Sequence, residues 1–150
     1  MKRHILRSDL VALLVALFLT SPLIYWGLDR RDPIIVHDFS LVPTEVRAGD
    51  RILRRISVTR LQLCVTDINV VIIDGARIRW IIDEPEITRP GTLGGPDTYF
   101  APMIIPPLAA PGEAEVRLVA KRACNPIQKF WPVITAYAPL KFTILPAKAL

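Results

Sequence analysis

The feature that most constrains this chain is an uninterrupted run of uncharged, mostly apolar residues from Leu10 to Leu28. As an α-helix rising about 1.5 Å per residue, the run spans roughly 28 Å, close to the hydrocarbon thickness of a bilayer. It has no polar face, which disfavours a buried helix of a water-soluble domain. The sequence therefore predicts one transmembrane helix over residues 10–28.

We expect this helix to remain attached as an uncleaved signal anchor. A cleavable signal peptide has a shorter apolar core and a small residue at position −3 of its cleavage site. The nearest candidate site here has Leu19 at position −3, and Pro22 follows the cut. Both residues disfavour cleavage.

Charged residues on either side of the run predict its orientation. Basic residues outnumber acidic ones before the run, whereas the two signs balance directly after it. Positive charge marks the cytoplasmic side of a membrane helix. We therefore expect residues 1–9 in the cytoplasm of a bacterial inner membrane, a short linker over 29–33, and residues 34–150 exported as a periplasmic or extracellular domain.

Small side chains recur at every fourth position of this segment. Ser8, Ala12, Ala16 and Thr20 would form one ridge along the helix, along which a second helix could approach closely. The pattern predicts self-association in the membrane. The alternative is that small residues are common in anchors rich in Leu and Ala.

The remainder of the chain has the composition of an all-β domain. The chain has 14 prolines among its 150 residues, and proline interrupts helices while it tolerates turns and strand edges. Apolar and polar residues alternate with a period of two in several short segments, which indicates strands. We expect an antiparallel sandwich of about seven strands, at 37–41, 51–65, 68–73, 77–82, 98–105, 115–124 and 133–145, where the last segment supplies one or two strands.

The clearest hairpin signal lies between 68–73 and 77–82. Asp74 and Gly75 accept the positive φ values of a type I′ turn, so we expect the two segments to pair. The alternation then places Ile78, Trp80 and Ile82 in the core, with Arg77 and Arg79 in water.

Two further residues predict which strands are uncovered. Pro102 cannot donate a ladder hydrogen bond and indicates an edge strand or a bulge. Arg54 interrupts an apolar face, which indicates a partly uncovered strand or an edge. Four arginines are expected to point outward from their strands, namely Arg51, Arg55, Arg77 and Arg79. They would form either a basic sheet face or an ordinary solvated surface.

Several segments resemble the immunoglobulin and fibronectin type III class of β-sandwich. The segment 43–50 is similar to the entry into the second strand of such domains, and 110–118 is similar to their penultimate strand. Three residues also follow in the order Cys, Trp, Cys, namely Cys64, Trp80 and Cys124. The resemblance implies a sandwich architecture and no particular activity. The chain also resembles small single-pass membrane proteins of prophage and tailed-phage genomes.

The cysteine count suggests one disulfide. An exported domain meets an oxidising environment, and the chain has two cysteines, Cys64 and Cys124. A bond between them would close a loop of about 60 residues and stabilise the fold by up to about 4 kcal/mol. The alternative is two separate buried thiols.

The loop at 124–132 is the best candidate for a binding surface. Two prolines stiffen it, and Lys129, Phe130 and Trp131 lie next to one another within it. Aromatic side chains on a stiff loop bury much area against a partner at low entropic loss. The alternative is that the two aromatics fold back and cap one end of the sandwich.

The sequence contains no recognisable catalytic or metal-binding motif. His4 and His37 are the two histidines, and neither has triad or zinc-ligand spacing around it. The acidic residues Asp83, Glu84 and Glu86 lack the spacing of an EF-hand. We therefore expect no enzyme, cofactor, metal or nucleic-acid partner.

The function that these features favour is a membrane-anchored binding or assembly module. Its expected partner is a second membrane or envelope protein. A phage-encoded effector of lysis or superinfection exclusion is a second hypothesis, and an enzyme is a third.

Overall fold

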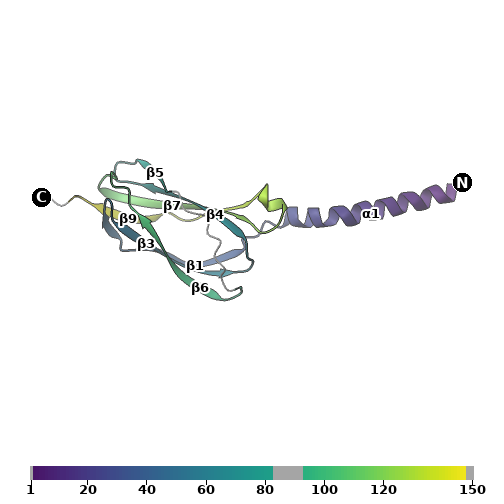
Figure 1. The fold of residues 1–150 in the computed structure, drawn as a ribbon, viewed down its shortest axis with the longest axis horizontal. Coiled ribbons are helices and arrows are strands. Elements are labelled where there is room, and N and C mark those ends of the chain that lie inside the picture. Colours follow the sequence, from purple (N-terminus) through teal and green to yellow (C-terminus); the bar gives the residue numbers. More distant parts are fainter. Residues whose placement is uncertain (1, 83–92, 148–150) are drawn as a thin grey trace.

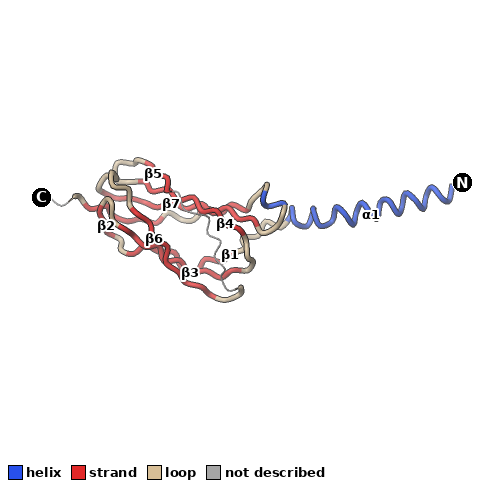
Figure 2. Tube along the Cα trace, in the orientation of Figure 1, coloured by secondary structure: helices blue, strands red, loops and turns tan. Residues whose placement is uncertain are grey.

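The computed structural model describes residues 2–82 and 93–147, with side chains from residue 9 onward. A single helix, α1, projects from one end of an elongated β domain (Figures 1 and 2). The elements are α1 (Lys2–Leu28), β1 (Ile34–Val42), β2 (Glu45–Arg47), β3 (Arg51–Arg60), β4 (Val65–Ile73), β5 (Arg79–Ile82), β6 (Pro96–Ile104), β7 (Gly112–Ala123), η1 (Ile127–Lys129), β8 (Val133–Ala136) and β9 (Leu140–Leu145).

The strands form two sheets. One has the order β1-β3-β6, and the other has the order β2-β9-β7-β4-β5, with β8 also paired to β7. All pairs are antiparallel except β2 with β9, which is parallel. The second sheet is therefore mixed, because β2 runs in the same direction as the last strand beside it.

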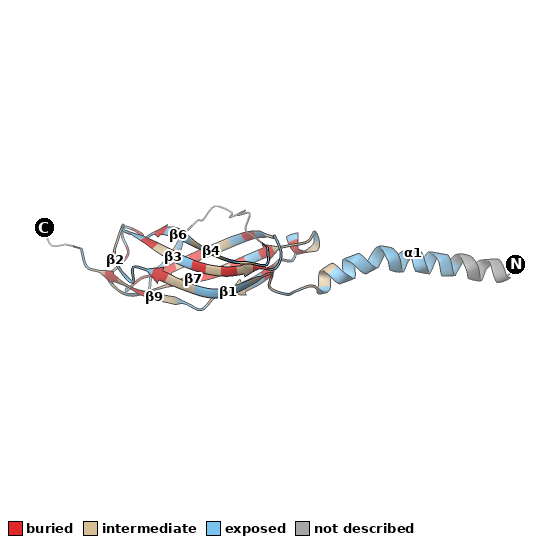
Figure 3. Ribbon diagram, turned by 90° about the horizontal axis from the view of Figure 1, so that it is seen from below, coloured by how far each residue is buried: buried red, intermediate tan, exposed pale blue. Residues whose placement is uncertain are grey.

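Buried apolar side chains form two clusters, a large one with residues from both sheets and a smaller one of Ile56, Val58 and Ala101. The alternating face of β3 that carries Ile52, Ile56 and Val58 is buried, as the period of two predicts. On β7 the same holds for Val116 and Leu118, which lie in a cluster with residues of β1, β3, β4, β6 and β9. Figure 3 shows this alternation of buried and exposed positions along the strands. It also shows α1 exposed from residue 9 onward, except near the β domain, where Trp26 and Gly27 are partly buried.

The helix α1 is apolar and lies outside the core. Its segment Asp9–Leu28 has a mean hydropathy of 2.0, is 0% buried, and is long and apolar enough to cross a membrane. Pro22 lies inside the helix and cannot donate a hydrogen bond to the carbonyl of Phe18. The Ser21 hydroxyl donates to that carbonyl instead, at 3.2 Å, so the acceptor keeps a partner within the helix.

The strand pattern differs from the expected one in number. Nine strands are present among the described residues, whereas we expected about seven. The closing segment 133–145 divides into β8 and β9, and the three-residue β2 adds a further strand. A strand of three residues is too short to show an alternation of apolar and polar residues, so the sequence did not predict β2.

The expectation for Arg54 was wrong, whereas that for Pro102 is confirmed. Arg54 is 1% exposed and lies on β3, the central strand of its sheet, where we expected a partly uncovered strand or an edge. Pro102 lies on β6 and pairs with Leu53 at the edge of the same sheet. The outward arginines are all exposed, but Arg51 and Arg55 belong to one sheet and Arg79 to the other, so they do not share one sheet face.

Over 37–41 the sequence alternates His37, Phe39 and Leu41 with Asp38 and Ser40, which predicts one face for the first three, and β1 departs from this at His37. Its register with β3 shifts between Val36 and Asp38, which leaves His37 exposed and hydrogen-bonded to Thr59 at 2.8 Å. Phe39 and Leu41 pack into the core as expected. A bulge adds one residue to one strand, and it depends on the partner strand rather than on local sequence.

The hairpin between β4 and β5 forms, but its turn is not type I′. The positive φ falls on Arg77, at 66°, and not on Gly75. The Arg77 N–H donates to the Asp74 carbonyl at 2.9 Å, and the Asp74 N–H donates to the Ile78 carbonyl at 3.1 Å. Trp80 is partly buried against the core, whereas Ile78 is exposed.

The Asp74 side chain organises this turn. One carboxylate oxygen accepts hydrogen bonds from the N–H groups of Ala76 and Ile78, at 3.0 and 2.9 Å. The other accepts from the Trp80 indole and the Ala110 N–H, both at 3.0 Å. Burial alone would raise the pKa of Asp74, but these four hydrogen bonds outweigh it and hold the pKa below its usual value.

Candidate functional site

The end of the β domain from which α1 leaves gathers most of the unusual features of the molecule. The connection 29–33, the loop 124–132 and the disulfide all lie at this end (Figure 1). We call this region the junction. It joins residues about 100 positions apart in the chain, as the separations of 99 and 101 in its hydrogen bonds show.

Two amides of the loop hold the end of α1. The Asn125 side chain donates to the Trp26 carbonyl at 3.3 Å, and the Gln128 side chain donates to the Asp29 carbonyl at 2.7 Å. The Gln128 oxygen in turn accepts from the Cys124 N–H at 2.8 Å. Helices leave their last carbonyls without intrahelical partners, and here the loop supplies two donors at the end of α1.

Arg30 adds a second contact between the connection and the loop. Its guanidinium donates to the carbonyls of Trp131 and Pro132, at 2.7 and 3.1 Å. The guanidinium carbon also lies 4.4 Å from the centre of the Trp131 ring, within the range of a cation–π interaction. The loop backbone and one aromatic ring are thus both fixed to the residues that follow α1.

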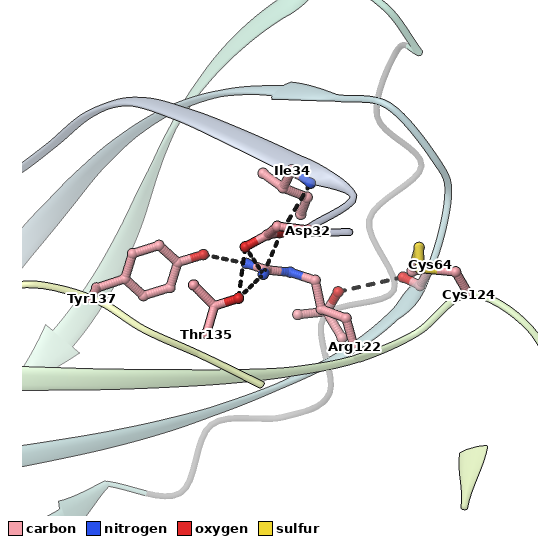
Figure 4. A network of polar contacts seen from close by, with 8 residues as sticks. Asp32, Ile34, Cys64, Arg122, Cys124, Thr135 and Tyr137 are labelled. Carbon is pink, nitrogen blue, oxygen red and sulfur yellow. Dashed lines mark hydrogen bonds and ion pairs between the residues drawn. A yellow bond between two sulfur atoms is a disulfide. The ribbon is translucent and has the colours of Figure 1, made fainter. Parts of the chain in front are cut away.

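Arg122 is the centre of a polar network at the junction (Figure 4). Its guanidinium is 3% exposed and contacts Asp32 at 2.8 Å, Thr135 at 3.2 Å and the Tyr137 hydroxyl. Asp32 also accepts from Thr135 at 2.6 Å and from the Ile34 N–H at 3.1 Å. The network therefore joins the first residues of β1 to β7 and β8.

The two cysteines form the expected disulfide. Cys64 and Cys124 are joined with an S–S distance of 2.04 Å across a separation of 60 residues, directly before β4 and directly after β7 (Figure 4). At the junction, this bond therefore links the beginning of β4 to the end of β7. Trp80, the middle member of the Cys, Trp, Cys order, binds Asp74 at the opposite end of β4.

The candidate binding residues lie on the surface of the junction. Phe130 is 92% exposed and Trp131 is 62% exposed, and Lys129 beside them is also exposed. The aromatic rings therefore do not fold back to cap the sandwich, which was the alternative interpretation. The buried residue of this loop is Gln128, whose amide makes the helix contact.

A cavity of about 500 Å³ lies beneath the junction, between the two sheets. Its lining is mostly apolar and includes Ile34, Val36, Ile56, Val58, Ile68 and Ala120. Arg122 also lines it, and the Nε of Arg122 has no hydrogen-bond partner among the described residues. The cavity therefore combines a mostly apolar lining with polar side chains, among them Arg60, Gln62 and Arg122.

The small residues of α1 are separate from the junction. Ala12, Ala16 and Thr20 are exposed on the helix, and the Thr20 hydroxyl donates to the Ala16 carbonyl at 2.8 Å. The Ser8 side chain lies outside the described part of the structure. Nothing within the described residues covers this ridge, as Figure 3 shows for this part of the helix.

Sequence reasoning missed the polar residues that build the junction. Asp32, Arg122, Asn125 and Gln128 each act through a partner that is distant in the chain. The acidic segment Asp83 to Glu86 lies outside the described residues, and the described residues contain no cluster of three potential metal ligands.

Comparison with known proteins bears on the fold alone. No protein-family model matches the chain, and no curated protein matches it either. Among solved structures, the chain is similar to the Pseudomonas fluorescens alkylpurine DNA glycosylase AlkC bound to DNA containing an abasic site analog. The TM-score is 0.52 at 10% sequence identity, and the match covers 77% of this chain and 31% of the glycosylase chain.

Proposed function

We infer that this protein is a single-pass membrane protein that presents an exported β-sandwich as a binding module. In this proposal α1 crosses the bilayer, residues 1–9 are cytoplasmic, and the β domain is periplasmic or extracellular. The apolar surface of α1, which the β domain leaves exposed over most of its length, supports the anchor, since an exposed apolar helix is stable in lipid and not in water. Tyr25 and Trp26 near its end fit the aromatic belt of a membrane interface.

The strand order supports an immunoglobulin-like architecture for the exported domain. Strand β1 pairs with β3 in one sheet, while β9, β7, β4 and β5 are neighbours in the other. The parallel pairing of β2 with β9 fits the same class. The disulfide does not, because it joins the ends of the neighbouring strands β4 and β7 of one sheet, whereas immunoglobulin domains have a disulfide between the two sheets. Domains of this architecture present their end loops as binding surfaces, and the loop 124–132 is one of these.

The observation that carries the proposal is the fixed junction with two exposed aromatic rings. The contacts of Asn125, Gln128 and Arg30 hold the loop against the end of α1. Phe130 and Trp131 are thereby kept at a constant, short distance from the membrane. Anchoring raises the local concentration of the surface for a partner in the same membrane or envelope. Lys129, Phe130 and Trp131 are the proposed contact residues.

A second contact in the membrane is part of the same proposal. The ridge of Ser8, Ala12, Ala16 and Thr20 would pair with a second α1 helix, because small residues allow close backbone approach. Self-association would place two loops side by side and double the partner-binding surface. Replacing Ala12 and Ala16 by Ile would separate the helices and is expected to abolish dimer crosslinking in membranes.

Site-specific photocrosslinking in native membranes tests the proposed surface. A photoreactive phenylalanine analogue in place of Phe130 should yield one crosslinked product, and the same analogue in place of Leu108 should not. Leu108 is a matched control because it is 82% exposed and precedes β7, at the end of the domain opposite the junction. The Trp131→Ala change should remove the product from the Phe130 position. Equal crosslinking at both positions would contradict the proposal.

A further inference from the structure

We propose that the cavity beneath the junction binds the ester-linked acyl chain of a membrane lipid. The inference rests on the proposed membrane anchor, which supplies the lipid. Three properties of the cavity support it: its size and mostly apolar lining, its position, and the unpaired Nε of Arg122, one of its lining residues.

The size and lining of the cavity fit an aliphatic chain. Binding cavities for small ligands measure about 300–1,000 Å³, and this one measures about 500 Å³. Ile56 and Val58 line it from β3, Ile68 lines it from β4 and Ala120 lines it from β7. An apolar cavity of this kind offers water few hydrogen-bond partners, so an apolar ligand is the favoured occupant.

The position of the cavity gives that ligand a source. Ile34 lines the cavity and is the first residue of β1, directly after the connection 29–33. Five residues reach at most about 20 Å, so this end of the domain stays close to the bilayer surface. Cys64 lines the cavity as well, and its disulfide partner, Cys124, is the first residue of the loop that holds α1. The cavity is thus at the membrane-facing end of the domain.

The free N–H of Arg122 selects the polar part of the ligand. Arg122 lines the cavity, and its Nε has no partner among the described residues. Leaving a buried donor unpaired is unfavourable, so an acceptor oxygen on the ligand would complete it. The charge of Arg122 is already balanced by Asp32 at 2.8 Å. A neutral ester carbonyl fits this donor better than a second carboxylate, because it adds no charge to the pair.

Photolabelling with a lipid of known composition tests the inference in the full chain. The protein is placed in nanodiscs of phosphatidylethanolamine and phosphatidylglycerol that contain a phospholipid with a diazirine in its acyl chain. After illumination, peptide mapping should find adducts on α1 and also on cavity residues such as Ile56, Val58 and Ala120. In a second arm, a free fatty acid with the same diazirine should label the cavity at least fivefold less.

A pair of variants on β1 separates cavity binding from surface labelling. Val36 lines the cavity, whereas Ile35 is its exposed neighbour on the other face of the strand. Val36→Trp should fill the cavity and reduce its adducts at least fivefold, while Ile35→Trp should leave them unchanged. Circular dichroism and thermal melting report whether each variant is folded. If Val36→Trp does not fold, Ile34→Trp at the rim of the cavity replaces it.

The outcomes separate the two proposals. Adducts on α1 without adducts in the cavity overturn the lipid site and leave the membrane anchor standing. Absence of adducts on α1 overturns the anchor, and with it the source of the lipid. Equal cavity labelling in the Val36→Trp and Ile35→Trp proteins overturns the site as well. Labelling of the cavity by the free acid but not by the phospholipid overturns the assignment of an ester-linked chain.

Discussion

Asp32 and Arg122 form an ion pair at 2.8 Å across 90 residues of sequence. Asp32 lies in the connection between α1 and β1, and Arg122 lies on β7. The pair therefore fixes the direction in which the chain enters the β domain after α1.

Replacing Asp32 by Asn should destabilise the β domain by about 2 kcal/mol, because Arg122 would remain buried with its charge unbalanced. Chemical denaturation of the full chain in detergent measures the effect. Asp38→Asn is the matched control, since Asp38 pairs with Arg55 on the surface at 3.8 Å with both side chains about half exposed. Its expected effect is below about 0.5 kcal/mol. Equal losses in the two variants would contradict the structural importance of the Asp32–Arg122 pair.

Replacing Asp74 by Asn should destabilise the fold by about 2–3 kcal/mol at neutral pH. One carboxylate oxygen becomes an NH₂ group, which cannot accept the N–H bonds now made to that oxygen, from Trp80 and Ala110. Asp67→Asn is the control, because Asp67 is exposed on the same strand, β4. Urea denaturation at pH 7 should distinguish the two variants.

The stabilisation by Asp74 should also depend on pH. The pKa of Asp74 is lowered in the folded protein, so its stabilisation is fully present above the unfolded pKa, about 3.9, and is lost as the pH falls through the folded value. The difference in unfolding free energy between the wild type and Asp74→Asn should therefore be constant from pH 7 to about pH 5 and shrink below about pH 4. A difference that grows on acidification would contradict this assignment.

Removing the disulfide should lower stability by up to about 4 kcal/mol, because the bond closes a loop of 60 residues. The double variant Cys64→Ser, Cys124→Ser should melt at a lower temperature than the wild type. A reducing agent should have no further effect on it, whereas the wild type should shift toward the variant. If a reducing agent, given access to the bond by unfolding, leaves the melting temperature of the wild type unchanged, the bond is absent.

The double variant Phe130→Ala, Trp131→Ala should keep the fold and lose the partner. Phe130 makes little contact in the domain, and Trp131 loses mainly its interaction with Arg30, which corresponds to about 1 kcal/mol or less. Thermal melting measures the fold, and crosslinking from Lys129 with a bifunctional amine reagent measures partner capture. A variant that unfolds would show that the loop is part of the core.

Most strands and the core could be predicted from the sequence because alternation is a local property. Ile52, Ile56 and Val58 share one face of β3 for this reason. The bulge at Val36 and Asp38 could not be predicted in this way, because it exists only in the register with β3. The short strand β2 likewise depends on β9, which is about 100 residues later in the chain.

The junction could be predicted only in part. Exposure of Phe130 and Trp131 and the pairing of Cys64 with Cys124 agree with what the residue types suggest. The bonds that hold the loop to α1 do not follow from local sequence, because Asn125 and Gln128 bind main-chain carbonyls, which any residue at positions 26 and 29 would offer. For the same reason, the buried state of Arg122 could not be foreseen from a charged residue in an alternating strand.

The central claim is that α1 crosses a membrane with the β domain on the far side. The most direct test labels single introduced cysteines in intact cells with a membrane-impermeant maleimide, since both native cysteines are bonded to each other. Leu108→Cys should be labelled once the outer envelope is permeable, and Lys2→Cys should be labelled only after the inner membrane is broken. Labelling of Lys2→Cys before Leu108→Cys, or recovery of the full chain in the aqueous fraction without detergent, would contradict the account.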